Sequence, residues 1–291
     1  MPAAHIALAI LVAAIYGTAF VAIQYAVLEI PPLMATGYRY VFTALPLIFF
    51  IRKPNVAWLH LAAYGIMQAV VMFGIIFTAI RMGMPPGLAS MVVQLQVFFT
   101  VFFAFALMGE KPTPKQILGA AIAIFGVGII GWGLGASAPL VPFFMTIASA
   151  AAWGIANIIS KKAKPNSMLG YVVCSGAFAP LPLFALSSLI EGTNFGILPV
   201  WPPSPIVIAS ILYLAYPTTV LAFTAWVFLL QKHSAAAVTP FALLIPIFGM
   251  GSTAIMFGEP LSAITLFGAA LVFIGLAVAV IRRRTIRVFK Q

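Results

Sequence analysis

Acidic residues are almost missing from this sequence. Asp is absent, four Glu are present, and charged residues of both signs make up only 7% of the 291 residues. A soluble domain of this length needs polar and charged side chains over most of its surface, which this composition cannot supply. The absence of Asp excludes a Ser-His-Asp triad, and there is no HExxH motif and no carboxylate pair. We therefore expect neither a soluble fold nor an enzyme.

Cysteine is equally scarce. Cys174 is the only one, so an intramolecular disulfide is impossible, and its position in an apolar run predicts simple packing. No GxxxxGK[ST] loop is present, which excludes transport powered by a nucleotide-binding loop on this chain. We expect no cofactor and no metal.

Long hydrophobic runs, in contrast, fill the chain. Hydrophobic residues make up 64% of it and the mean hydropathy is +1.16. Because about 20 apolar residues cross the hydrocarbon as a helix, these runs predict an all-α integral membrane protein with ten transmembrane helices and no soluble domain. The predicted spans cover residues 5–28, 33–51, 58–80, 86–108, 115–133, 139–160, 167–190, 206–230, 235–257 and 262–281.

The basic residues are distributed unevenly between the two sides of this topology. Every Lys and Arg except Arg39 and Arg81 falls in loops of one side or in the C-terminal tail. The positive-inside rule places that side, and with it both termini, in the cytoplasm. The bases stand singly between apolar runs instead of forming one polar face, so the net charge of +11 does not indicate nucleic-acid binding.

A set of four residues recurs with identical spacing in the two halves of the chain. Five spans in each half is an odd number, so the second copy enters the membrane in the opposite sense, an architecture typical of secondary transporters. We expect one repeat over residues 1–135 (spans 1–5) and another over residues 136–291 (spans 6–10 and the basic tail). The two sets are Gly109, Glu110, Gly119 and Gly126, and Gly258, Glu259, Gly268 and Gly275.

These repeated residues are expected to be structural. Gly119 and Gly126 lie on one helix face, as do Gly268 and Gly275, and small residues in that position allow close helix packing. Glu110 and Glu259 precede predicted helix starts, where the helix dipole favours a carboxylate, so structural roles are preferred to proton carriage.

Several of these segments resemble a known family. Gly109-Glu110-Lys111 and its copy, together with Trp153-Gly154 and Asn157, are similar to the drug/metabolite transporter superfamily with two EamA-type halves. The first span departs from the family pattern, because Tyr16-Gly17 stands in place of Trp-Gly and no Asn follows. Within that superfamily, the chain most resembles bacterial exporters of the O-acetylserine/cysteine and aromatic amino-acid types.

The resemblance implies a secondary transporter of the bacterial inner membrane that exports aromatic and other neutral amino acids or their derivatives. The alternatives are efflux of drugs or other metabolites, and a membrane scaffold that transports nothing. Highly anionic nucleotide sugars would require several buried bases, and cationic drugs usually require a buried carboxylate, and neither is available.

Polar and aromatic side chains within the spans are the candidates for a substrate site, because polar groups in a membrane tend to face an interior cavity. Gln94 and Gln96 are about 200° apart on a helix, so we expect one to bind and the other to pack. Arg39 either extends to the nearby helix end or binds a substrate carboxylate. The full set is Tyr16, Thr18, Tyr38, Arg39, Gln68, Gln94, Gln96, Trp153, Asn157 and Tyr213.

Transport is expected to proceed by alternating access through a central cavity. Prolines inside spans remove backbone hydrogen bonds and permit bending, so Pro217, Pro240 and Pro246 are candidate gating positions. All four Glu fall at span ends or in loops. We therefore expect no proton relay within the membrane.

Overall fold

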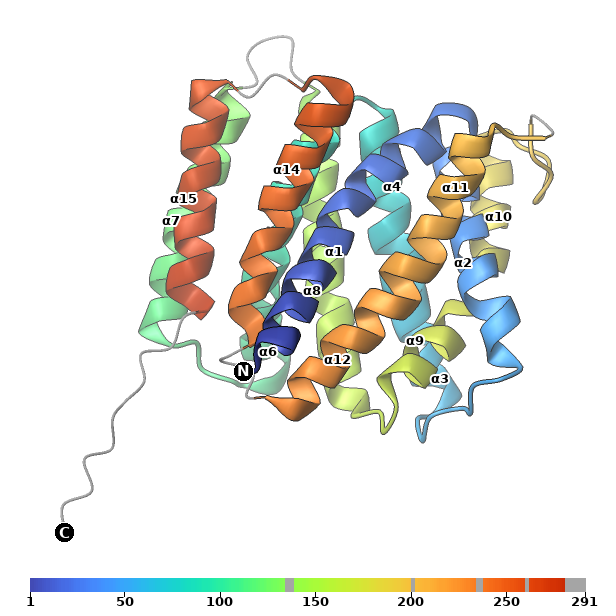
Figure 1. Ribbon diagram of the computed structural model, residues 1–291, viewed down its shortest axis with the longest axis horizontal. Coiled ribbons are helices and arrows are strands. Elements are labelled where there is room, and N and C mark those ends of the chain that lie inside the picture. The colour runs from blue at the N-terminus through green and yellow to red at the C-terminus, as the bar shows by residue number, and fades with distance from the viewer. Residues whose placement is uncertain (134–138, 200–201, 234–237, 260–261, 281–291) are drawn as a thin grey trace.

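The chain folds into a bundle of helices whose long axes run roughly side by side (Figure 1). The computed structural model describes residues 1–133, 139–199, 202–233, 238–259 and 262–280, and these contain helices and no strand. Eight helical segments of the described residues are long and apolar enough to cross a membrane, and several of them consist of two or three of the elements named below. The tail bases used in the orientation argument, which lie in residues 281–291, fall outside the described residues.

The first half begins with one long helix, and two of its later helices change their winding part-way along. A π-helical segment interrupts the third predicted span and a 3₁₀ segment interrupts the fourth. The elements are α1 (Ala3–Glu29), α2 (Pro32–Ile48), α3 (Trp58–Gly65), η1 (Ile66–Phe73), α4 (Gly74–Arg81), α5 (Pro86–Val92), η2 (Val93–Leu95), α6 (Gln96–Met108) and α7 (Pro114–Gly133).

The second half has similar irregularities. A second π segment, η3, interrupts the eighth predicted span, and a second 3₁₀ segment, η4, begins the ninth. The elements are α8 (Leu140–Ala163), α9 (Met168–Gly176), α10 (Pro180–Ile190), α11 (Pro205–Tyr213), η3 (Leu214–Ala222), α12 (Phe223–Lys232), η4 (Thr239–Leu243), α14 (Leu244–Phe257) and α15 (Ala263–Val280).

The predicted span over residues 167–190 is not one continuous helix. It is divided between α9 and α10, and residues 177–179 lie outside both. Pro180 begins α10, and Pro182 follows within its first turn. Since proline has no N–H to donate to the preceding turn, it is tolerated at a helix start but ends a helix that precedes it. The span was predicted from hydropathy, and hydropathy does not show where a helix is interrupted.

The repeated glycines hold α7 and α15 together, and Figure 1 shows these two helices side by side at one end of the molecule. A Cβ on Gly126 would lie 2.7 Å from the carbonyl oxygen of Gly268, and a Cβ on Gly119 would collide with the carbonyl oxygen of Gly275. The pairing is crossed, because the earlier glycine of one helix meets the later glycine of the other. The two helices are therefore antiparallel and in backbone contact.

Two further glycines bring the interior helices together. A Cβ on Gly17 of α1 would lie 2.7 Å from the carbonyl oxygen of Ile245 in α14. A Cβ on Gly154 of α8 would lie 2.8 Å from Cβ of Phe99 in α6. Such close approach, which only glycine allows, fixes the positions of the residues that precede these glycines, Tyr16 and Trp153.

Candidate functional site

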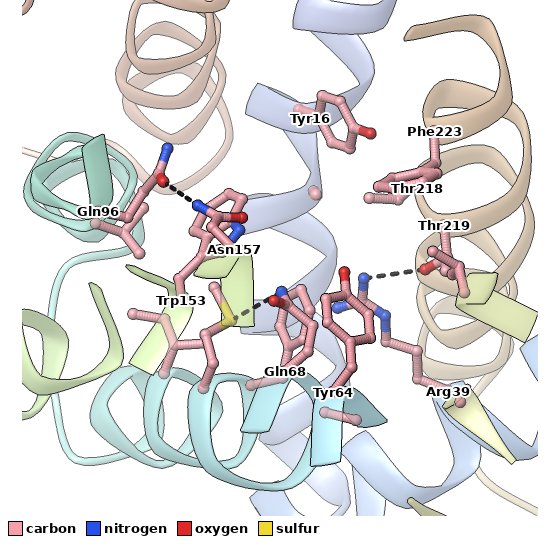
Figure 2. Close-up of a pocket in the computed structure, with 18 of the residues that line it drawn as sticks. Tyr16, Arg39, Tyr64, Gln68, Gln96, Trp153, Asn157, Thr218, Thr219 and Phe223 are labelled. Carbon is pink, nitrogen blue, oxygen red and sulfur yellow. Dashed lines mark hydrogen bonds between the residues drawn. The ribbon is translucent and has the colours of Figure 1, made fainter. Parts of the chain in front are cut away.

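A cavity of about 340 Å³ lies in the interior of the bundle, within the range of small-molecule sites. Its wall is built by α1, α2, η1, η2, α6, α8, η3 and α12, with further contributions from their neighbours (Figure 2). Most of the lining is apolar or aromatic. Of the residues predicted from the sequence, it contains Tyr16, Arg39, Gln68, Gln94, Gln96, Trp153 and Asn157.

Arg39 of α2 is the one charged side chain in this lining, among the residues that the structure describes. Only 3% of it is exposed, so it does not extend outward to the helix end, which was one of its two expected roles. Its Nη2 donates a hydrogen bond to Thr219 Oγ1 at 3.0 Å, and the centroid of the Phe73 ring lies 3.9 Å from Cζ. Its Nε and Nη1 have no hydrogen-bond partner.

A buried cation with unused donors is strongly destabilising unless a ligand or a counter-charge satisfies it. The Phe73 ring lies close to the guanidinium, but an aromatic ring neither carries a counter-charge nor replaces the hydrogen-bond acceptors that Nε and Nη1 lack. The planar guanidinium matches the two oxygens of a carboxylate. The surroundings of Arg39 therefore suit an anionic ligand better than a structural ion pair.

Gln68, in contrast to Arg39, has an acceptor that lacks a hydrogen-bond donor. Its Nε2 lies 3.7 Å from Met72 Sδ, which is a weak acceptor, and its buried Oε1 has no partner. Gln68 belongs to the π segment η1, where one carbonyl, that of Met72, accepts a hydrogen bond from Ser149 Oγ of α8 at 2.9 Å. The π turn contains Gln68, which lines the cavity and whose amide oxygen has no hydrogen-bond partner.

A second group of amides joins α8 to α6 (Figure 2). Asn157 Nδ2 donates to Gln96 Oε1 at 2.8 Å and to Thr100 Oγ1 at 2.9 Å. Gln94 also lines the cavity, although we expected only one of Gln94 and Gln96 to face it. Because the helix is 3₁₀ over 93–95, the angle between the two side chains differs from that in an α-helix. Gln94 is buried and Gln96 is half-buried, and the expectation that one binds while the other packs stays a prediction.

Three predicted residues do not line the cavity, because their hydroxyls bond elsewhere. Thr18 Oγ1 donates to the carbonyl of Ala14 at 2.7 Å and lies 2.6 Å from the Tyr213 hydroxyl, which joins α1 to α11. The Tyr38 hydroxyl donates to the carbonyl of Gly196 at 2.6 Å. Helical position alone could not show which hydroxyls were already satisfied.

Other cavity residues were not predicted as binding residues. Tyr64, Phe20 and Phe223 carry no sequence signal that separates them from the many aromatic residues of the core. Thr218 and Thr219 do carry one, because they follow Pro217 in η3. Their hydroxyls donate to the carbonyls of Tyr213 and Leu214, at 3.1 and 2.8 Å. Thr219 thereby acts as acceptor for Arg39 and as donor to its own helix.

The three candidate gating prolines occupy different environments. Pro217 lies inside the π segment η3, where a helix can bend. Pro240 is in the first turn of η4, and Pro246 is in the first turn of α14. A helix start does not require the N–H that Pro240 lacks. Because α14 continues η4 without a break, Pro246 lies inside a continuous helix and removes a backbone hydrogen bond there.

Glu110 and Glu259 both lie away from the cavity and contact neighbouring helices instead of the helix starts that follow them. Glu110 Oε2 lies 2.6 Å from Lys161 Nζ, at the end of α8. Glu259 accepts hydrogen bonds from the backbone N–H of Gly87 in α5 at 3.2 Å and from Thr253 Oγ1 at 3.0 Å. Burial raises the pKa of the Glu259 carboxyl, and these two hydrogen bonds partly offset the effect.

Comparison with known proteins identifies the family. The model of the EamA-like transporter family matches the chain twice, over residues 4–132 and 140–281. The chain belongs to this family. It is therefore a multi-pass membrane transporter and not an enzyme, and the resemblance noted in the sequence is confirmed.

Two relatives that match nearly the whole chain have the same descriptive name. A protein of Salmonella typhimurium named "Probable amino-acid metabolite efflux pump" is 36% identical, with 97% of each chain covered. A protein of Escherichia coli K12 with the same name is 34% identical, over 94% of this chain and 93% of the relative. A protein known from a crystal structure shares the fold with a TM-score of 0.60 and 21% identity, over 93% of this chain and 95% of that one.

Proposed function

We propose that this transporter exports amino acids and their derivatives through the central cavity by alternating access. The observation that carries the proposal is the Arg39 guanidinium, which has no counter-charge and two unpaired donors in a mostly apolar and aromatic cavity and suits the carboxylate that every amino acid has. The aromatic lining, including Tyr16, Trp153 and Phe223, suits aromatic and other neutral side chains. The names of the two efflux-pump relatives support the same substrate class.

Ten membrane crossings in two inverted repeats, over residues 1–135 and 136–291, are part of this proposal. Support comes from the paired irregularities: a π segment in each half (η1, η3), a 3₁₀ segment in each half (η2, η4), and left-handed glycines, Gly109 and Gly258, at the ends of α6 and α14. The antiparallel contact of α7 with α15 agrees with it. Two inverted halves around one cavity can open it alternately to each side.

The proposed membrane is the bacterial inner membrane, with both termini in the cytoplasm. The lining of the cavity reaches Ser160 and Met168, which flank the basic loop containing Lys161, Lys162 and Lys164. If the positive-inside rule places that loop in the cytoplasm, the cargo enters from the cytoplasmic side.

Reconstitution tests this proposal. The protein is placed in liposomes, and the exchange of labelled phenylalanine is measured in competition with each amino acid and with N-acetylated and O-acetylated derivatives. We expect saturable exchange and inhibition by a subset of these compounds. If none is transported and none competes, the proposed function is wrong.

A further inference from the structure

We propose that the preferred cargo has a net charge of −1: an amino-acid derivative with a free carboxylate and an amine that is blocked and uncharged, as in an N-acyl amino acid. The inference rests on the proposed function and narrows it, because an ordinary neutral amino acid is a zwitterion with an ammonium group. It follows from the charges and from the unused hydrogen-bonding groups of the cavity.

The first argument is electrostatic. Among the described residues that line the cavity, Arg39 is the one charged group. Each of the four Glu of the chain bonds to a group outside that lining: Glu29 to Ser204 N, Glu110 to Lys161, Glu191 to Leu33 N and Glu259 to Gly87 N. A carboxylate cargo neutralises the cavity, whereas a zwitterion leaves one net positive charge in a medium of low dielectric constant.

The second argument concerns the unused hydrogen-bonding groups. Nε and Nη1 of Arg39 are free donors, and Oε1 of Gln68 is a free acceptor. In Figure 2 both side chains approach the cavity, and Tyr64 lies between them in that view. These three unpaired atoms are enclosed by neighbouring side chains, so a cargo reaches them when those side chains shift on binding. A carboxylate then accepts from the guanidinium, and one amide N–H of the cargo satisfies the Gln68 amide oxygen. An ammonium brings three donors and a positive charge, whereas the buried unpaired acceptors of the lining, Gln68 Oε1 and Ser175 Oγ, are both neutral.

The other residues of the cavity wall suit the side chain and the acyl group of such a cargo. Phe20, Met72 and Phe223 line the cavity together with Trp153 and supply apolar surface for a side chain and an acyl group. The Asn157 Nδ2 group already donates to Gln96 and Thr100, and its Oδ1 is a neutral acceptor that brings no negative charge to an ammonium. The wall therefore adds apolar contact and no second charge.

The experiment compares four compounds that share a phenyl ring in liposomes containing the full chain. N-acetylphenylalanine has a carboxylate and an amide N–H, 3-phenylpropionate has a carboxylate alone, phenylalanine is a zwitterion, and phenylalanine amide is a cation. We expect the transport efficiency to fall in that order, with N-acetylphenylalanine at least about tenfold above phenylalanine. Protein-free liposomes measure leakage of each compound.

Two substitutions test the assignment of the groups. Arg39→Gln should abolish the preference for the anions. Lys115→Gln, which removes an exposed cation from α7, a helix that does not line the cavity, should leave the preference unchanged. Gln68→Glu places a carboxylate in the cavity wall and should reverse the order of phenylalanine and N-acetylphenylalanine. This reversal requires a gain of phenylalanine transport, which an unfolded variant cannot show.

The outcomes separate this inference from the proposed function. If phenylalanine is transported as well as or better than N-acetylphenylalanine, the monoanion inference is overturned and amino-acid export stands. If no compound of the series is transported or competes, both are overturned. If N-acetylphenylalanine is preferred but Gln68→Glu leaves the order unchanged, the assignment of Gln68 is wrong.

Discussion

At the level of single residues, three glutamates make the same kind of hydrogen bond. Glu29, Glu191 and Glu259 each accept a hydrogen bond from a backbone N–H near the start of a helix other than their own. A carboxylate at a helix start satisfies an unpaired N–H and interacts favourably with the helix dipole. The acids of this chain therefore join helix ends, which leaves Arg39 without a buried counter-charge.

Glu259 makes stability depend on pH. Because its pKa is raised above the usual 4.5, the folded protein holds this proton more tightly than the unfolded chain. Its contribution to stability is present below the unfolded pKa and is lost as the pH rises through the folded pKa. We expect Glu259→Gln, which carries no charge, to gain thermal stability relative to the unmodified protein as the pH rises from about 4 to about 8. Unfolding of both proteins in detergent, followed by tryptophan fluorescence, measures this difference; a constant difference would contradict the prediction.

Residue type and hydropathy were enough to predict Gln68 and Asn157 as cavity residues, since polar groups in apolar spans tend to face an interior. For Arg39 they left two alternatives, extension to the helix end or a place in the cavity. The same reasoning failed for Thr18 and Tyr38, because their hydroxyls bond to backbone carbonyls, which no residue pattern specifies. Tyr64 was missed since nothing in its local sequence separates it from a packing aromatic.

At the level of helices, the most extensive contact between two helices is that of α7 with α15. Both helices carry two glycines seven residues apart, and the backbone of one lies against the backbone of the other at these positions. The spacing of the glycines was sufficient to predict close packing. It could not predict that the partner would be the equivalent helix of the other half.

Gly126 and Gly128 provide a matched pair for testing this interface. A side chain at Gly126 would meet the Gly268 carbonyl, whereas a Cβ at Gly128 meets nothing within 4 Å. We expect Gly126→Ile to lower the free energy of unfolding by about 2 kcal/mol or more. Gly128→Ile should change it by about 0.5 kcal/mol or less. Both are measured by equilibrium unfolding in mixed detergent micelles; equal effects would show that α7 and α15 do not pack as described.

At the level of the whole molecule, the distribution of charged residues determines whether a proton gradient or the membrane potential can drive transport. The four glutamates of the chain contact helix ends or Lys161, so the described structure contains no carboxylate in the cavity to carry protons. A monoanion needs no proton for export, since an inside-negative potential favours its exit by about 2.3 kcal/mol per 100 mV. This corresponds to about a 50-fold accumulation ratio per 100 mV.

The membrane potential should therefore drive transport, and a pH gradient should not. Liposomes loaded with N-acetylphenylalanine are given an inside-negative potassium diffusion potential with valinomycin, and efflux is compared with that under a pH gradient of equal free energy. We expect faster efflux under the potential, and no such effect in protein-free liposomes. Efflux that strictly requires the pH gradient would contradict the absence of a proton relay.

Amino-acid composition is sufficient to place this chain in a bilayer, because a sequence that is 64% hydrophobic and only 7% charged cannot cover a water-exposed surface. The repeated Gly-Glu segments similarly predict two related halves, since their spacing is a property of the chain and not of its folding. The cavity is different. Arg39 of α2, Gln68 of η1 and Thr219 of η3 are brought together by helix packing and by two π turns, whose backbone winding has no signature in hydropathy. Which donors and acceptors stay unpaired, and so which cargo the cavity suits, depends on that packing.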